Sequence, residues 1–124
     1  MALDKKTILA FSDRQVAPVP CPEWGGEVYV RTMTGKERAA WDRLTVELMQ
    51  DGRITDTGIW AANLVQMTCC DEKGNLVFTA ADVAALVEKS GKVLERIALA
   101  SLRLNAVGNS EVADERKVFP AAKA

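Results

Sequence analysis

With 124 residues, the chain is long enough for one folded domain that needs neither a disulfide nor a metal ion to hold it together. Its sixteen basic and seventeen acidic side chains give a net charge of −1, a balance that argues against whole-molecule attraction to nucleic acid or to an anionic membrane. Histidine is absent, and without this commonest general base and metal ligand we expect a protein that is not an enzyme and binds no metal or cofactor.

The cysteines and the N-terminal segment indicate the cellular compartment in which the protein is expected. The three cysteines are an odd number, and the adjacent Cys69 and Cys70 would form a strained ring if they were bridged to each other. Unpaired thiols suit a reducing environment. The apolar run from Thr7 to Phe11 is far too short for a signal-peptide core or a membrane span. We therefore expect a cytoplasmic protein.

The first third of the chain predicts a short helix followed by a hairpin. Residues 3 to 11 fit a helix that is too brief to be stable unless it docks on the rest of the protein. Three prolines before residue 23 favour an extended arm, Gly25-Gly26 permits a reversal, and residues 27 to 33 alternate like a half-buried strand. The candidate inward-facing residues are Val16, Val19, Val28 and Val30.

Four helices are predicted after the hairpin. The first, over residues 35 to 50, begins with a capping box formed by Thr34 and Glu37 and has an apolar stripe of Ala40, Trp41, Leu44 and Leu48. The second, over 57 to 70, is capped by Asp56 and is apolar around most of its circumference, which is typical of a central helix. The third covers about 80 to 89, and the fourth runs from the break at Ser90-Gly91 to about 107.

These elements predict an α+β fold that is mainly α, with the N-terminal β-hairpin packed on about four helices. We expect a single domain over residues 1–108. Residues 109–124 mix charges with Pro120 and small side chains, which is typical of a flexible, disordered C-terminal tail.

Motifs that resemble chemical sites are incomplete. Gly91-Lys92 resembles the end of a phosphate-binding loop, but the first glycine and the hydroxyl residue of that motif are missing. Asp71, Lys73 and Asn75 have the spacing of a calcium-binding loop, but Lys73 puts a positive charge at a ligand position. Cys69-Cys70 is better explained as a pair of small core residues than as a metal site, since too few other ligands are present.

Two features indicate a protein-binding surface instead. Trp24 lies at the predicted reversal, where an indole either packs on the domain or meets a partner, whereas the helix pattern places Trp41 and Trp60 in the core. On the fourth helix, one stripe carries an apolar residue among three cations, a pattern that suits an acidic or amphipathic partner helix. The members of this stripe are Lys92, Arg96, Leu99 and Arg103.

Five segments, taken in order, resemble the tail assembly chaperones of long-tailed, non-contractile phages and prophages, and the resemblance spans about residues 3 to 110. Each segment alone is common, and their order and spacing carry the specificity. Residues 111 to 124 do not resemble the usual polar ending of the family. The segments are 22 to 31 (PEWGGEVYVR), 34 to 38 (TGKER), 71 to 79 (DEKGNLVFT), 82 to 86 (DVAAL) and 103 to 105 (RLN).

The resemblance implies a non-enzymatic protein of the host cell cytoplasm that is absent from the finished virion. It implies binding to the tape measure protein, recruitment of the tail tube protein, and a tendency to form a homo-oligomer, with no nucleic-acid or membrane partner. The alternative is a generic cytoplasmic helical adaptor or regulator that occludes one protein partner. A small nucleic-acid binder using the cationic stripe is a further alternative from another class.

Overall fold

The computed structural model describes residues 2–107, and the predicted flexible tail lies outside that range. The chain begins with α1 (Lys5–Ala10), followed by β1 (Val16–Cys21), a 3₁₀ turn η1 (Pro22–Trp24) and β2 (Gly26–Arg31). Next come α2 (Gly35–Leu48), the short pair β3 (Met49–Gln50) and β4 (Arg53–Ile54), α3 (Thr57–Thr68) and β5 (Cys69–Cys70). A 3₁₀ turn η2 (Ala80–Asp82), α4 (Val83–Leu86) and α5 (Gly91–Leu104) complete the described part.

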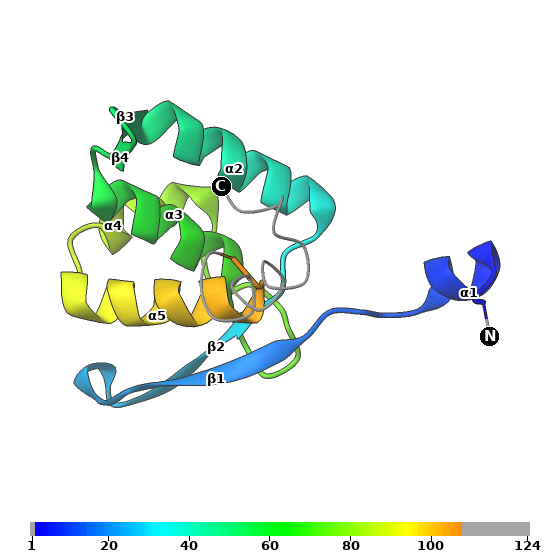
Figure 1. Ribbon diagram of the computed structural model, residues 1–124. Helices are drawn as coiled ribbons and strands as arrows, with labels where there is room; N and C mark the ends of the chain where they lie inside the picture. The colour runs from blue at the N-terminus through cyan, green and yellow to red at the C-terminus, as the bar shows by residue number, and fades with distance from the viewer. Residues whose placement is uncertain (1, 108–124) are drawn as a thin grey trace.

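The layers of the molecule can be followed in Figure 1. The β1–β2 hairpin runs along α5, α3 lies beside α5, and α2 packs on α3 (Figure 1). In the sheet, β2 is the central strand between β1 and β5, and both pairings are antiparallel, with Val19 opposite Val28 and Tyr29 opposite Cys70. The fold is therefore α+β and mainly α, as predicted.

Two apolar clusters hold these layers together. The larger lies between the sheet and the helices and includes Val19, Val30, Val65 and Ile97, all buried. The smaller joins α2, α3 and α5 around Trp41. Burial of such side chains contributes roughly 25 cal/mol for each Å² of apolar surface removed from water.

One buried polar pair fixes α3 against α5. The hydroxyls of Thr68 and Ser101 lie 2.7 Å apart, and both side chains are fully buried. Each hydroxyl also lies within hydrogen-bond distance of the carbonyl four residues earlier in its own helix, that of Leu64 for Thr68 and that of Ile97 for Ser101. Because each hydroxyl carries one hydrogen, one of them donates to its helix carbonyl and accepts from the other. Because buried hydroxyls need partners, this pair favours one alignment of the two central helices.

The predicted start signals are confirmed in their geometry. Glu37 donates its amide to Thr34 Oγ1, and the Thr34 amide donates to Glu37 Oε1, so the capping box of α2 is complete. Asp56 accepts the amide of Ile59 at the start of α3. At Thr79, before η2, a similar capping box forms with Asp82, whose Oδ2 accepts from the Thr79 amide and hydroxyl.

Several predicted boundaries and faces are wrong. The helix predicted over residues 35 to 50 ends at Leu48, because Met49 and Gln50 pair with Ile54 and Arg53 in an antiparallel ladder. The helix predicted over residues 57 to 70 ends at Thr68, and Cys69–Cys70 forms the third strand of the sheet. The helix predicted over about 80 to 89 is a 3₁₀ turn followed by a four-residue helix. The last predicted helix, which was expected to reach about residue 107, ends at Leu104.

Two of the predicted inward residues also lie elsewhere. Val16 is an odd number of positions from Val19 along β1, so the two side chains point to opposite faces of the sheet. The Val16 side chain instead lies near Gly74, and Ala40 is exposed on α2.

Candidate protein-binding surface

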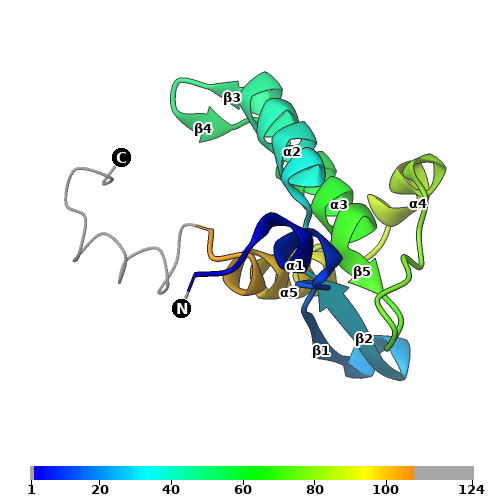
Figure 2. The ribbon, with the colours of Figure 1, turned by 90° about the vertical axis from the view of Figure 1, so that its right-hand side faces the viewer.

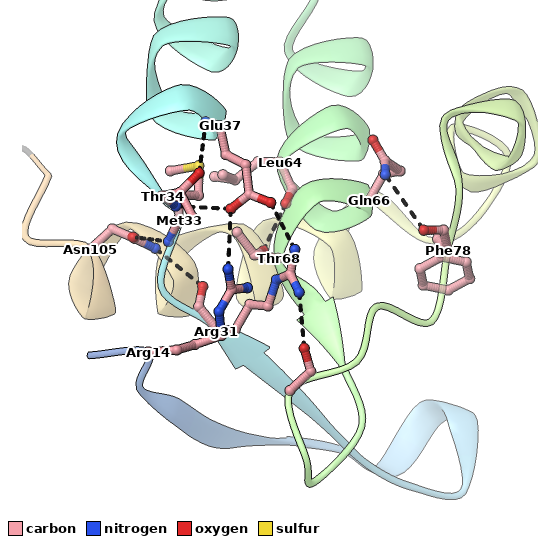
Figure 3. Close-up of polar contacts among 11 residues, drawn as sticks. Arg14, Arg31, Met33, Thr34, Glu37, Leu64, Gln66, Thr68, Phe78 and Asn105 are labelled. Carbon is pink, nitrogen blue, oxygen red and sulfur yellow. Dashed lines mark hydrogen bonds and ion pairs between the residues drawn. The ribbon is translucent and has the colours of Figure 1, made fainter. Parts of the chain in front are cut away.

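A polar junction at the open end of the hairpin sets the position of the sheet relative to α2 (Figure 3). Arg31, whose side chain is 12% exposed, donates to Glu37 Oε2 at 2.8 Å and to the carbonyl of Gly74 at 2.9 Å. Arg14 lies 3.8 Å from the other oxygen of Glu37. Asn105 joins α5 to the junction, since its Oδ1 accepts the amide of Met33. These contacts link four segments without forming an open site.

The closed end of the hairpin is attached to α5 by a different ion pair. Arg96 donates from both terminal nitrogens to the two carboxylate oxygens of Glu23, each at 2.7 Å. This fork geometry fixes the direction of both side chains. Arg96 therefore attaches the hairpin to α5, and its predicted contact with a partner stays a prediction.

Glu23 gives a measurable signature of this attachment. Its hydrogen bonds to Arg96 lower the pKa of the carboxyl from 4.5 to about 2. A lowered pKa means that the attachment is fully present above pH 4.5 and is lost as the pH falls through about 2. We expect Arg96→Gln to move the pKa of Glu23 back towards 4.5, as measured by NMR titration of its side-chain carbonyl carbon. An unchanged pKa would contradict the pairing.

Trp24 follows directly after Glu23 and lies over a cleft rather than in the core. The indole side chain is 37% exposed and lines a hollow of about 220 Å³ together with Phe78, Ala85 and Leu86. Lys89 and Asp82 also line this Trp24 cleft. Trp24 is thus partly accessible at a cleft that it lines together with residues of α4, and whether it meets a partner stays a prediction.

The remaining members of the predicted stripe are exposed along α5. Lys92 and Arg103 are exposed, and Leu99 is 39% exposed. Leu99 lines a groove of about 450 Å³ between the first turns of α3 and the N-terminal half of α5, here called the α3–α5 groove. Small residues such as Gly58, Gly91 and Ala98 leave the groove hollow, and Trp60 and Leu94 give it apolar walls.

The structure thus separates the five predicted residues into two groups. Trp24 and Arg96 meet at the closed end of the hairpin through Glu23, and Lys92 is close enough to this carboxylate to lower its pKa further. Leu99 and Arg103 lie further along α5, and of these Leu99 lines the α3–α5 groove. Whether any of them contacts a partner stays a prediction.

The exposed N-terminal helix was missed as a candidate surface. Four large apolar side chains in and beside α1 are at least half exposed: Leu3, Ile8, Leu9 and Phe11. The signal was visible in the sequence, because a helix of six residues is not stable unless it docks on other residues.

The three cysteines lie among the described residues, and all are buried. Burial raises the pKa of each thiol, to about 12 for Cys69, so reactive thiolate is scarce. Within residues 2–107, no three or more cysteine, aspartate or glutamate side chains are grouped as metal ligands. Every helix in this range is too short or too polar to cross a membrane.

Comparisons with known proteins agree with this picture of a binding protein. A family model described as phage tail assembly chaperone matches residues 5–117. The fold is similar to that of the tail assembly chaperone of bacteriophage HK97, with a TM-score of 0.60 and 21% identity over 85% of this chain and 94% of the other. No curated protein matches. Because the family model covers most of the sequence, the chain belongs to the phage tail assembly chaperone family.

Proposed function

We propose that this chaperone binds the tape measure protein during tail assembly and helps to recruit tail tube subunits around it. The observation that carries the proposal is the family match over residues 5–117. Exposed apolar side chains on a charged surface support it, since a chaperone for a helical client needs such patches. We propose the host cytoplasm as its location and absence from the finished virion.

The Trp24 cleft is the surface that we propose for the client. It offers a half-exposed indole beside Phe78 and Leu86, with Lys89 and Asp82 supplying both signs of charge. Tryptophan side chains in partly open apolar pockets are common centres of binding energy. An apolar side chain on one face of a client helix fits such a hollow.

Co-expression with the tape measure protein of the same phage tests the chaperone proposal. We expect the soluble fraction of the tape measure protein to rise severalfold when this chain is present. Trp24→Ala should weaken the interaction at least tenfold, because a buried aromatic anchor contributes about 2 kcal/mol or more. The measurements are the soluble fraction after centrifugation and the Kd of the purified pair.

Val46→Ala is the matched control, since Val46 is 69% exposed on α2 and does not line the cleft. Circular dichroism should show both variants folded. Equal insolubility of the tape measure protein with and without this chain would contradict the chaperone proposal. Equal binding by Trp24→Ala and Val46→Ala would remove the Trp24 cleft from the interface.

A further inference from the structure

The α3–α5 groove is an apolar hollow that lies close to the last described residues. Leu94 and Ala98 are buried in its α5 wall, and Leu99 at its rim is 39% exposed. Among the described residues that line it, Glu95 alone is charged, and its side chain is exposed. The volume of about 450 Å³ is enough for several apolar side chains. Such a hollow suits a short peptide that offers apolar side chains beside a cation.

The end of α5 turns the chain back along the helix. Ala106 has a φ of +56°, and its amide donates to the carbonyl of Arg103 at 3.1 Å. The amide of Val107 donates to the carbonyl of Leu102 at 2.8 Å. These two bonds around a left-handed residue form the Schellman ending of a helix, which reverses the chain. Leu102 lies one turn after Ala98, so the described chain ends beside the stripe of α5 that continues into the groove.

The packing of Val107 supports this direction. Val107 packs against the smaller apolar cluster together with Trp60 and Ala61, and these two side chains and the buried Ala98 of the cluster also line the groove. In Figure 2 the last described residues, in orange, leave α5 on the side away from α4. The Trp24 cleft includes residues of α4 and is therefore a different surface. The groove is thus continuous with contacts that the chain already makes.

The sequence that follows Val107 contains a segment that matches the groove. Arg116-Lys117 directly precedes Val118-Phe119-Pro120, and these residues, 116–120, are here called the basic–apolar segment. Its apolar pair suits the apolar walls of the groove, and its two cations complement Glu95. A residue that precedes proline, as Phe119 does, favours an extended backbone, which lowers the entropy cost of lying in a groove.

The connection between Val107 and this segment has a suitable length. Residues 108–117 lie between Val107 and Val118, and a flexible chain of about ten residues has an end-to-end distance of roughly 16–19 Å. From Leu102 back to Glu95, α5 rises about 10 Å at about 1.5 Å per residue. The connection is therefore long enough to reach the groove, and a short flexible connection gives an effective concentration in the mM range.

We propose that the α3–α5 groove is a binding site for an extended basic–apolar peptide, and that the basic–apolar segment of the same chain occupies it, with its apolar pair in the groove and its cations towards Glu95. Bound in this way, the segment covers apolar surface and competes with any other peptide for the groove. The contact lies within one chain and at a surface other than the Trp24 cleft, so it does not depend on the client proposal.

A nitroxide spin label on the full chain tests where the segment lies. The label is attached at Ala121→Cys, directly after the segment, because the native thiols are buried and their pKa values are raised. We expect the label to reduce the amide NMR signals of Gly58 and Gly91, which line the groove at the first turns of α3 and α5, to less than half. Signals that stay at full intensity would overturn the proposal.

Two variants of equal charge separate docking from a segment that only passes near the groove. Val118→Asp, Phe119→Asp should restore the signals in the labelled chain. Asn109→Asp, Ser110→Asp adds the same charge outside the segment and should leave the signals reduced. Equal signals in the two variants would overturn the proposal. So would signals that are reduced when the nitroxide and the isotope label are on different chains in a mixture, because the occupant would then belong to a second copy.

Binding of a synthetic peptide with the sequence of residues 112–124 gives a second measurement. The full chain with Val118→Asp, Phe119→Asp should bind this peptide at least tenfold more tightly than the natural chain, in which the internal segment competes at an effective concentration in the mM range. Adding Glu95→Lys to that variant should weaken the binding. Equal affinities, or no binding to the variant, would overturn the proposal. No client is present in these experiments, so failure here leaves the chaperone proposal intact.

Discussion

Trp41→Ala is expected to lower the free energy of unfolding by about 3–5 kcal/mol, the usual range for removing a large aromatic side chain from a core. Trp41 is 3% exposed and packs with Leu64 and Ala98, so it joins α2 to both central helices. Its ring centroid lies 5.4 Å from that of Trp60, with the planes inclined by 37°. The truncation therefore removes both apolar contact and a favourable ring pair.

Chemical denaturation followed by circular dichroism measures this loss. Val46→Ala on the same helix is the control, because a 69% exposed side chain should change stability by no more than about 0.5 kcal/mol. Equal midpoints for the two variants would mean that α2 presents a different face to the core. A lowered slope as well as a lowered midpoint would indicate a change in the unfolded or native ensemble.

The parts of the fold that could be predicted from the sequence are those governed by local chemistry. A hydroxyl at position 34 and a carboxylate three residues later define the start of α2, whatever packs on it. Likewise, apolar residues around most of residues 57 to 68 can be buried only in the centre, and Leu64 and Val65 are fully buried there. These signals need no knowledge of distant segments.

One missed element had a local signal. Asp51 and Gly52 have φ values of +53° and +76°, the left-handed pair that a two-residue hairpin turn requires. An Asp-Gly pair between Gln50 and Arg53 is typical of such a turn, whereas the sequence pattern predicts a helix up to residue 50. The short strands Met49–Gln50 and Arg53–Ile54 follow from that turn.

Other misses depend on contacts between distant residues. Cys69 and Cys70 form a strand instead of the last turn of the helix because they pair with β2. The two cysteines themselves carry no local signal for this pairing. The pairing of Arg96 with Glu23 joins residues 73 positions apart. A helical wheel shows only neighbours on one helix, so it cannot show that Arg96 is paired with Glu23.

Arg31→Ala is expected to lower the free energy of unfolding by about 2–4 kcal/mol, because the change removes two charge-assisted hydrogen bonds from a largely buried site. The guanidinium joins the Gly74 carbonyl to Glu37, and so connects the turn after β5, the sheet and the start of α2 (Figure 3). Loss of Arg31 leaves the carbonyl and the carboxylate without their main partner. Thermal and urea unfolding measure the effect.

Arg38→Ala is the matched control, since Arg38 forms an exposed pair with Asp42, one helical turn away, at 3.5 Å. That pair should contribute about 0.3–0.5 kcal/mol. Arg31→Lys should give an intermediate loss, because an ammonium keeps the charge but lacks the planar fork that reaches two acceptors. Similar losses for Arg31→Ala and Arg38→Ala would show that the junction is not a centre of stability.

A double-mutant cycle separates the role of Glu37 from that of Gly74. Glu37→Gln alone removes the ion pair with Arg31 and weakens the capping box, whereas Arg31→Ala also releases the Gly74 carbonyl. If the two changes act through one network, the double variant should lose at least 0.5 kcal/mol less than the sum of the single losses. Strict additivity would mean that Arg31 stabilises the fold mainly through the Gly74 turn, and that the capping box of α2 works independently of the sheet.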